Sequence, residues 1–402
     1  MSDRHDTSDT DDEDGETTLS VGMLGYRFMG YAHANALARL PMFFPNAPAV
    51  SREVLIGQDE DALDAAADRL GFSRTATDWE EAIEAVDVLY NLGPNHLHAE
   101  PSIAALEAGT NVFCEKPLAR TIEEAERMRA AARDSAALAA CGFNYRFVPA
   151  IQYAKELIAA GELGEIHHVR GQYLQDGWAD PDVPWSWRLS EDLAGSGALG
   201  DLGAHTIDLV RFLAGYQVGK VERVSGHLGT FVEERPVDGG GGESNETTDT
   251  GGDGAGTEAR PVTVDDAYSA QLAFESGAMG TVEASRFATG HKNDHAIAIH
   301  GSKGSLTFSL ERLNELEVLR EGNRGYETVS VTDEADPYVE AWWPPGHVIG
   351  WEHTFVHENS EFLSAVAEGS AFRPSFDDGY EVQQVLGAIE RSDERGEWVS
   401  IE

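Results

Sequence analysis

The first third of the chain alternates short apolar runs with stretches in which apolar residues recur at helical spacing. The apolar runs are LSVGMLG at 19–25, EVLIG at 53–57, VDVLYNLG at 86–93, TNVFCEKP at 110–117 and ALAACGFNY at 137–145. Each is short enough for one buried strand, and an amphipathic helix pattern separates it from the next. Strands that alternate with helices predict a parallel sheet wrapped by helices. We therefore expect an α/β domain over residues 19–142.

The pattern changes after this domain. A helix is predicted at 150–164, and a series of longer runs between 166 and 321 then alternates apolar with polar residues. Such a series predicts one large, mostly antiparallel sheet. Helical spacing returns at 201–215 and near 380–391. Residues 143–402 are therefore expected to form a C-terminal α+β domain for substrate binding and oligomerisation.

Two polar stretches stand apart from both domains. Residues 1–18 are acidic and polar, so we expect a disordered tail. Residues 236–262 are rich in glycine and acidic residues, and strand patterns resume on either side. We expect a solvated acidic loop there rather than a domain boundary.

The charge balance indicates the solvent more than the chemistry. Among 402 residues, 29 Lys and Arg face 71 Asp and Glu, which gives a net charge of −42, and only 5 of the basic residues are Lys. This charge repels phosphate backbones and excludes nucleic acid as a partner. Because molar salt screens the repulsion between dispersed carboxylates, the composition indicates a halophilic protein.

Three absences in the sequence concern the compartment. The chain has only Cys114 and Cys141, too few for a disulfide framework. Its first residues show no secretory signal, and no apolar run is long enough for a membrane span. We therefore expect a cytoplasmic protein.

The turn after the first predicted strand reads Gly25-Tyr-Arg-Phe-Met-Gly30. A Rossmann fold places G-x-G-x-x-G at this point, with pyrophosphate bound at the helix N-terminus. Gly25 would make the tight turn and Gly30 the close helix–sheet contact, while Arg27 replaces the usual second glycine. The candidate cofactor contacts in this turn are Gly25, Arg27, Phe28, Met29 and Gly30. We expect the domain to bind NAD or NADP.

The choice between these two cofactors stays open. An acidic residue at the end of the second strand usually holds the ribose hydroxyl of NAD. Asp59 is the candidate, although it lies one or two residues late, and no arginine marks a site for the extra phosphate of NADP.

Three more segments place polar residues after a strand or at the start of a helix. They are Asn91-Leu-Gly-Pro-Asn-His-Leu-His98, Cys114-Glu-Lys-Pro117 and Gly200-Asp-Leu-Gly-Ala-His-Thr-Ile-Asp208. Together with GFNYRF at 142–147, this set resembles the Gfo/Idh/MocA family of sugar and polyol dehydrogenases over nearly all of residues 19–400. The resemblance implies NAD(P)-dependent oxidation of a CH–OH group. It adds these candidate cofactor contacts: Gly93, Pro94, Asn95, His98, Glu115 and Lys116.

The resemblance also implies a catalytic set of Lys116, Asp201 and His205. It implies that Lys116 lies beside the nicotinamide and that a cis bond before Pro117 aims it into the cleft. The residue types agree, because a histidine with an ordinary pKa of about 6.5 exchanges protons near neutral pH. Asp201 lies four residues before His205 and shares its helix face. We favour His205 as the acid/base and Lys116 as the group that polarises the oxygen, and the reverse stays open.

Further residues are candidate substrate ligands, because indole faces suit sugar rings and polar groups bind hydroxyls. Besides the catalytic set they are Arg146, Trp178, Trp187, Arg188 and His347. His353 and His357 share a helix face but lack the adjacent glutamate of zinc peptidases, so we expect no metal. The stretch GHVIGWEHTFVHE is similar to the levoglucosan dehydrogenase branch of the family.

The main hypothesis is a dehydrogenase that moves hydride between a secondary alcohol of a sugar, glycoside or cyclic polyol and the nicotinamide. One alternative is a redox-assisted glycosidase of the same fold, which returns NAD unchanged. Another is a cofactor-binding regulator without turnover. The family resemblance also implies a homo-oligomer, either a dimer or a tetramer.

Overall fold

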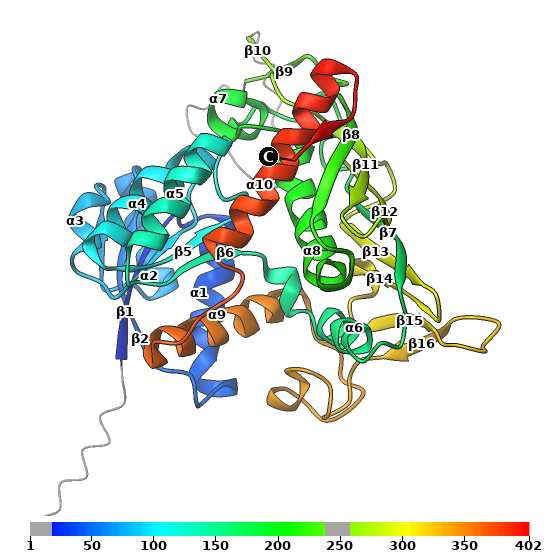
Figure 1. Cartoon of the computed structure of the whole chain (residues 1–402). Helices are drawn as coiled ribbons and strands as arrows, with labels where there is room; N and C mark the ends of the chain where they lie inside the picture. Colours follow the sequence, from blue (N-terminus) through cyan, green and yellow to red (C-terminus); the bar gives the residue numbers. More distant parts are fainter. Residues whose placement is uncertain (1–17, 238–257, 402) are drawn as a thin grey trace, which may run out of the picture.

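The computed structural model describes residues 18–237 and 258–401, which form two main sheets (Figure 1). The expected disordered tail, apart from residue 18, and most of the expected acidic loop lie outside the described residues. Among the described helices, none has the length and apolar character needed to cross a bilayer.

The first sheet has six parallel strands in the order β3-β2-β1-β4-β5-β6. They are β1 (Thr18–Leu24), β2 (Ala49–Ile56), β3 (Arg74–Ala76), β4 (Val88–Asn91), β5 (Asn111–Glu115) and β6 (Ala139–Gly142). This is the doubly wound order, in which ligands bind where the order reverses, here between β1 and β4. The predicted parallel sheet is confirmed. The short strand β3 was not predicted, because three residues are too few to show a period.

The helices of this half connect successive strands. They are α1 (Phe28–Phe43), α2 (Glu60–Leu70), α3 (Glu80–Ile83), the short η1 (Asn95–Leu97), α4 (Ala99–Ala108) and α5 (Ile122–Asp134). Their ends follow from local chemistry. The Asp59 carboxylate accepts from the Ala62 N–H to start α2, and Gly71 ends it in the left-handed conformation.

The second sheet has nine strands in the order β16-β15-β14-β13-β7-β12-β11-β8-β17. They are β7 (Ile166–Leu174), β8 (Val221–Gly229), β11 (Ala267–Phe274), β12 (Met279–Ser285), β13 (Asp294–Gly301), β14 (Ser305–Ser309), β15 (Glu315–Leu319), β16 (Glu327–Ser330) and β17 (Val399–Ser400). Only the β7–β12 pairing is parallel, so the prediction of a mostly antiparallel sheet is confirmed. β9 (Glu234–Pro236) and β10 (Ala259–Pro261) form a separate ribbon.

Helices cover one face of this large sheet and leave the other open (Figure 1). The covering helices are α6 (Pro149–Ala159), α8 (Ala204–Val218) and α10 (Phe376–Arg395). Short elements connect the rest: η2 (Asn144–Phe147), η3 (Trp187–Leu189), α7 (Glu191–Ala194), the π-helical η4 (Leu199–Gly203), η5 (Leu310–Arg312) and η6 (Val339–Ala341). Buried and exposed residues alternate along β11 and β12, as expected for a sheet with one solvated face.

The last two helices connect the halves. α9 (Trp351–Glu368) lies across α1, and its Phe355 and Phe362 contact His33 and Phe113 of the first half. α10 packs on both α5 and β8 (Figure 1). Both fall within the predicted second domain, yet they also cover the first sheet and hold the two halves together.

Candidate active site

The turn between β1 and α1 has the backbone shape that a pyrophosphate group requires. Gly25 adopts a φ of 101°, and a Cβ there would lie 2.7 Å from the Leu92 backbone oxygen. A Cβ on Gly30 would lie 2.5 Å from the Gly25 oxygen. No side chain caps α1, and its first turn holds no acidic residue. The amides at this N-terminus, from Phe28 to Gly30, therefore fit a bound anion.

The end of β2 differs from the usual NAD pattern. Asp59 acts as the N-cap of α2, and at Gly57 a Cβ would lie 2.3 Å from the Tyr26 ring. The exposed Arg27 is the N-cap residue of α1. The structure thus gives Asp59 a helix-capping contact and places a tyrosine ring beside the end of the strand.

The loop after β4 contains residues of two kinds. Gly93 and Pro94 are half-buried at the strand end. Asn95 instead donates to the Ala194 backbone oxygen at 2.8 Å. The buried His98 places its two ring nitrogens 2.9 and 3.0 Å from the backbone oxygens of Pro117 and Gly93. The side chains of Asn95 and His98, predicted as cofactor contacts, are therefore used to fix the loop.

Glu115 likewise positions the segment around it. Its Oε1 lies 3.1 Å from Nε2 of the buried His33 on α1, and its Oε2 accepts from the Lys116 backbone N–H at 3.1 Å. The Lys116–Pro117 bond is cis, as expected. The carboxylate of Glu115 thus links the cofactor-binding helix to the backbone of Lys116 and is occupied by these contacts.

Lys116 reaches a carboxylate of the second half. Its Nζ donates to the Asp201 backbone oxygen at 2.9 Å and to Oδ1 at 3.1 Å, while Oδ2 accepts from Arg286 at 3.0 Å. Burial alone would raise the pKa of Asp201, but Lys116, Arg286 and Arg188 lower it well below its usual range. Asp201 therefore stays ionised and holds Lys116, instead of acting as a base.

The segment carrying Asp201 is a π-helical turn that leads directly into α8. The buried Asp265 holds its start, because its carboxylate accepts from the backbone N–H groups of Gly197 at 2.7 Å and Leu199 at 2.8 Å. Such turns are frequent at functional sites. This turn and the first turn of α8 bring Asp201 and His205 to the same region.

His205 is a neutral, buried imidazole. Burial, followed by the charges of Lys116 and His295, lowers its pKa well below 6.5. Its Nδ1 has no hydrogen-bond partner among the described residues. The Tyr145 ring lies 4.6 Å from it, between centroids. His205 is therefore already in the form that accepts a proton at neutral pH.

A chain of hydroxyl groups runs beside His205. The Tyr145 and Tyr173 hydroxyls lie 2.8 Å apart, and Tyr173 donates to the Asn293 side-chain oxygen at 2.8 Å. Since Tyr173 uses its proton there, Tyr145 donates to Tyr173. Trp351 hydrogen-bonds Tyr145, and its ring stacks on Phe28 of the cofactor turn at 5.3 Å. These residues thus connect the cofactor turn to the wall around His205.

The predicted substrate ligands Trp178, Trp187 and Arg188 share the segment that follows β7. Arg188 is one of the cations that act on Asp201, and its guanidinium lies 4.7 Å from the ring centroid of the half-buried Trp187. Trp178 packs on the small apolar cluster of Leu189, Val262 and Val264.

Two predicted substrate ligands have other partners in the structure. Arg146 is buried and forms ion pairs with Asp208 and Asp378, so its guanidinium is used inside the fold. His347 is exposed, and its Nδ1 lies 2.7 Å from the Pro344 backbone oxygen. Among the described residues, neither forms a hydrogen bond or ion pair with Lys116, Asp201 or His205.

The histidines of α9 have structural partners. His357 accepts from Trp342 at 2.7 Å, and its Nδ1 lies 2.9 Å from the Phe147 oxygen; His353 accepts from the Gly350 N–H. Over residues 18–237 and 258–401, no cluster of three potential metal ligands occurs.

Sequence reasoning missed several residues at this centre. They are Arg286, Tyr173, Asn293, His295 and Trp351. Four of them lie in or next to strands of the second sheet, where no spacing relates them to Lys116. Trp351 lies in the GHVIGWEHTFVHE stretch, which was the one available signal.

Comparison with known proteins identifies the family. Residues 19–143 match the oxidoreductase family model with the NAD-binding Rossmann fold, and residues 151–307 match the Gfo/Idh/MocA C-terminal domain model. Levoglucosan dehydrogenase of Pseudarthrobacter phenanthrenivorans is 43% identical over 391 residues, 95% of this chain and 98% of that protein. The chain belongs to the Gfo/Idh/MocA oxidoreductase family.

Two similar solved structures share the fold over nearly the whole chain. The complex of levoglucosan dehydrogenase with NADH and levoglucosan is 41% identical, with a TM-score of 0.87 over 96% of this chain and all of that one. An oxidoreductase domain protein from Kribbella flavida is 46% identical, with a TM-score of 0.88 over the same shares. The expected Rossmann domain and its NAD cofactor are thus confirmed.

Proposed function

We propose that this protein is an NAD-dependent dehydrogenase that oxidises a secondary hydroxyl of an anhydro sugar or glycoside of the levoglucosan type. The observation that carries the proposal is the Lys116–Asp201 ion pair beside neutral His205, next to a turn shaped for a dinucleotide. The similarity to levoglucosan dehydrogenase supports the sugar class.

The side chains divide the reaction between them. Lys116, held by Asp201, donates a hydrogen bond to the reacting oxygen and stabilises its developing negative charge. His205 accepts the hydroxyl proton. Bound NAD supplies the hydride acceptor. The amides of the Gly25–Gly30 turn and the residues Gly93 and Pro94 would hold it, while Trp187 and Arg188 would contact the sugar.

A substrate panel tests this function. Levoglucosan, methyl glucosides, free hexoses and cyclic polyols are incubated with NAD or NADP at high salt, and the nicotinamide absorbance is followed. We expect steady NADH formation, fastest with an anhydro sugar or glycoside. Aglycone release without net NADH would indicate the redox-assisted glycosidase, and cofactor binding without turnover on any compound would indicate a regulator.

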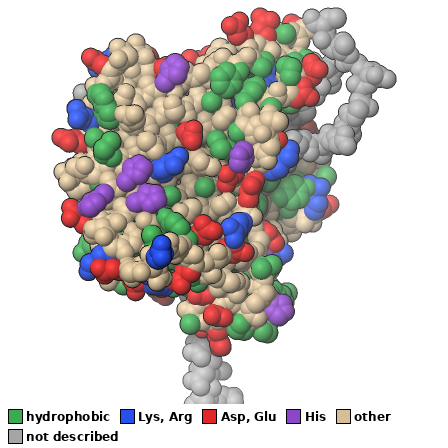
Figure 2. Space-filling view, turned by 90° about the vertical axis from the view of Figure 1, so that its right-hand side faces the viewer, with side chains coloured by type: hydrophobic (Ala, Val, Ile, Leu, Met, Phe, Trp, Pro, Cys, Tyr) green, Lys and Arg blue, Asp and Glu red, His purple; other side chains and the backbone are tan. Residues whose placement is uncertain are grey.

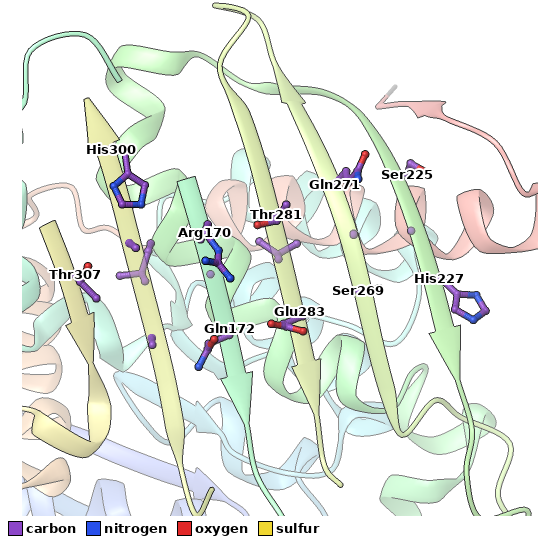
Figure 3. A pocket seen from close by; sticks show the side chains of 17 residues that line it. Arg170, Gln172, Ser225, His227, Ser269, Gln271, Thr281, Glu283, His300 and Thr307 are labelled. Atoms are coloured by element: carbon purple, nitrogen blue, oxygen red, sulfur yellow. The ribbon is translucent and has the colours of Figure 1, made fainter. Parts of the chain in front are cut away.

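We also propose that the protein is a homo-oligomer that associates through the open face of the large sheet. This face carries small and polar side chains (Figure 3), and those of its central strands line a cavity of about 830 Å³. The same face is seen from outside in Figure 2. Arg170, Gln172, Thr281 and Glu283 project from its central strands (Figure 3). None of the lining residues belongs to the catalytic set. Light scattering tests this: we expect the mass of a dimer or tetramer for wild type and a smaller mass for Thr281→Arg. A monomeric wild type, or the same mass for both proteins, would contradict the assignment.

The halophilic, cytoplasmic setting is a further proposal. The net charge of −42 with only 5 Lys supports the halophilic part, and the two free cysteines, Cys114 and Cys141, support a reducing compartment. The described ion pairs use arginine more often than lysine, as in Arg320 with Glu162 and Glu327.

A further inference from the structure

Arg286, immediately after β12, contacts three parts of the candidate site from a buried position. Its side chain is 1% exposed. Nη2 donates to Asp201 Oδ2 at 3.0 Å, and Nη1 donates to the Arg188 backbone oxygen at 3.4 Å. The guanidinium lies 5.6 Å from the Trp178 ring centroid. One side chain therefore joins Asp201 to the loop that carries Trp178 and Arg188.

We propose that Arg286 is a positioning residue for the dehydrogenase reaction: it fixes the Asp201 carboxylate and offsets part of its charge. Asp201 then orients Lys116, and its reduced negative charge does not strongly favour the protonated form of the base, whether this is His205 or Lys116. This inference rests on the proposed function.

The charges around Asp201 give the direction of the effect. Lys116, Arg286 and Arg188 act on Asp201, while Lys116, His295 and Asp201 act on His205. Arg286 itself also faces the buried Asp265 and Arg235. Without Arg286, the negative charge of Asp201 would act more fully on its neighbours. A nearby negative charge favours the protonated form of either Lys116 or His205.

The predicted shift is therefore independent of which residue is the base. Loss of Arg286 moves proton loss from the base to higher pH. The rising limb of kcat/KM for sugar oxidation, which reports proton loss from the base of the free enzyme, moves in the same direction.

Arg235 offers a matched control. It is also fully buried, and its guanidinium lies 5.4 Å from the same Trp178 ring. Its Nη groups donate to the backbone oxygens of Trp178 at 2.6 Å and Asp180 at 2.7 Å. Its replacement thus loosens the same loop while leaving the Arg286–Asp201 contact in place.

The experiment compares Arg286→Met, Arg286→Lys and Arg235→Met with wild type. For Arg286→Met we expect kcat/KM to fall by about 10²-fold and its rising limb to move up by about one pH unit. Arg286→Lys keeps the positive charge but loses the planar guanidinium. We therefore expect kcat/KM to fall while the rising limb of its pH profile stays at the wild-type pH. For Arg235→Met we expect the rising limb of the kcat/KM profile at the same pH as in wild type. Thermal unfolding and NADH fluorescence titration confirm that each variant folds and binds cofactor.

A second readout does not need turnover. With only 5 Lys in the chain, reductive methylation with ¹³C-formaldehyde gives few lysine resonances, and Lys116→Arg assigns the one from Lys116. We expect the chemical shift of this resonance to change more in Arg286→Met than in Arg286→Lys, because Asp201 then loses the partner that fixes its Oδ2. If wild type oxidises no sugar, the proposed function fails and this comparison of chemical shifts still tests Arg286.

Three results would overturn the inference. They are a pH profile of kcat/KM and a Lys116 resonance that both stay unshifted in Arg286→Met, an equal shift in Arg235→Met, and wild-type kcat/KM in Arg286→Lys. The last result decides the question even if Arg286→Met does not fold, because a lysine that replaces the guanidinium without loss leaves it no positioning role.

Discussion

At the scale of single residues, charged side chains of the same type have different roles because their partners differ. Lys116 is part-buried and paired with Asp201 beside a neutral imidazole. Arg146 is paired with Asp208 and Asp378 inside the fold. Removing one partner of a buried ion pair costs about 3–5 kcal/mol of stability. Substitution of Arg146 therefore affects folding, whereas substitution of Lys116 affects chemistry.

Lys116→Met tests this difference directly. The variant loses the donor to the reacting oxygen, so we expect kcat to fall by about 10³-fold. The NADH dissociation constant and the unfolding temperature stay near wild type. Steady-state kinetics, fluorescence titration and calorimetry measure the three quantities. Lys155→Met, which removes a half-buried lysine packed over the Phe212 ring, is the control. Turnover within a factor of a few of wild type would refute the role given to Lys116.

Glu358 on α9 gives a prediction about pH and stability. It is fully buried, neither carboxylate oxygen has a partner among the described residues, and burial and then Glu115 raise its pKa well above 4.5. The folded state thus keeps a proton that the unfolded state loses. Its contribution to stability is fully present below pH 4.5 and is lost as the pH rises through the folded pKa.

Glu358→Gln removes this pH dependence. Glutamine has nearly the same shape as the protonated acid and no proton to lose. We expect the variant to gain unfolding temperature relative to wild type as the pH is raised from about 5 to 9. Calorimetry at fixed salt measures the difference. Glu368→Gln, at the exposed end of the same helix, should show no such trend. A difference between Glu358→Gln and wild type that is constant with pH would contradict the prediction.

At the scale of elements, the first turn of α1 depends on the absence of a side chain. A Cβ on Gly30 would approach the Gly25 oxygen to 2.5 Å. Since this oxygen belongs to the cofactor turn itself, relief of the contact must displace the backbone that is shaped for pyrophosphate.

Gly30→Ala is therefore expected to weaken NADH binding by at least about tenfold, with a smaller loss of stability. Gly215→Ala in α8 is the matched control, because a Cβ there meets nothing within 4 Å. Alanine also has the higher helix propensity, so this control should be neutral or slightly stabilising. Fluorescence titration compares the two variants, and equal NADH affinity in both would contradict the assigned role of the turn.

The elements predicted from sequence are those whose signal is local. The spacing of apolar residues predicts the parallel strands, and glycines at strand ends predict the Gly25 turn. Asp201 and His205 lie together as their spacing predicts, because both are on one continuous helical segment. Arg286 lies 85 residues from Asp201, and its contact arises only when β12 packs beside that segment. The docking of α9 on α1 depends on tertiary packing in the same way. No local pattern encodes either contact.

At the scale of the whole molecule, charge is the dominant feature. The net charge is −42, and in dilute buffer the repulsion among carboxylates opposes compaction. The Debye length falls from about 10 Å at 0.1 M salt to about 3 Å at 1 M. Screening therefore becomes effective at distances between neighbouring surface side chains only near molar salt.

The proposed adaptation to salt predicts that stability and activity rise together with KCl. From about 0.1 to 2 M KCl we expect the unfolding temperature to increase by more than about 10 °C, with most of the gain as the Debye length approaches contact distances. Calorimetry and turnover are measured across the series. A neutral osmolyte at matched osmolality is the control, because it stabilises by exclusion from the surface without screening charge. An unfolding temperature independent of KCl, or one raised equally by the osmolyte, would show that repulsion between carboxylates does not limit the stability of this fold.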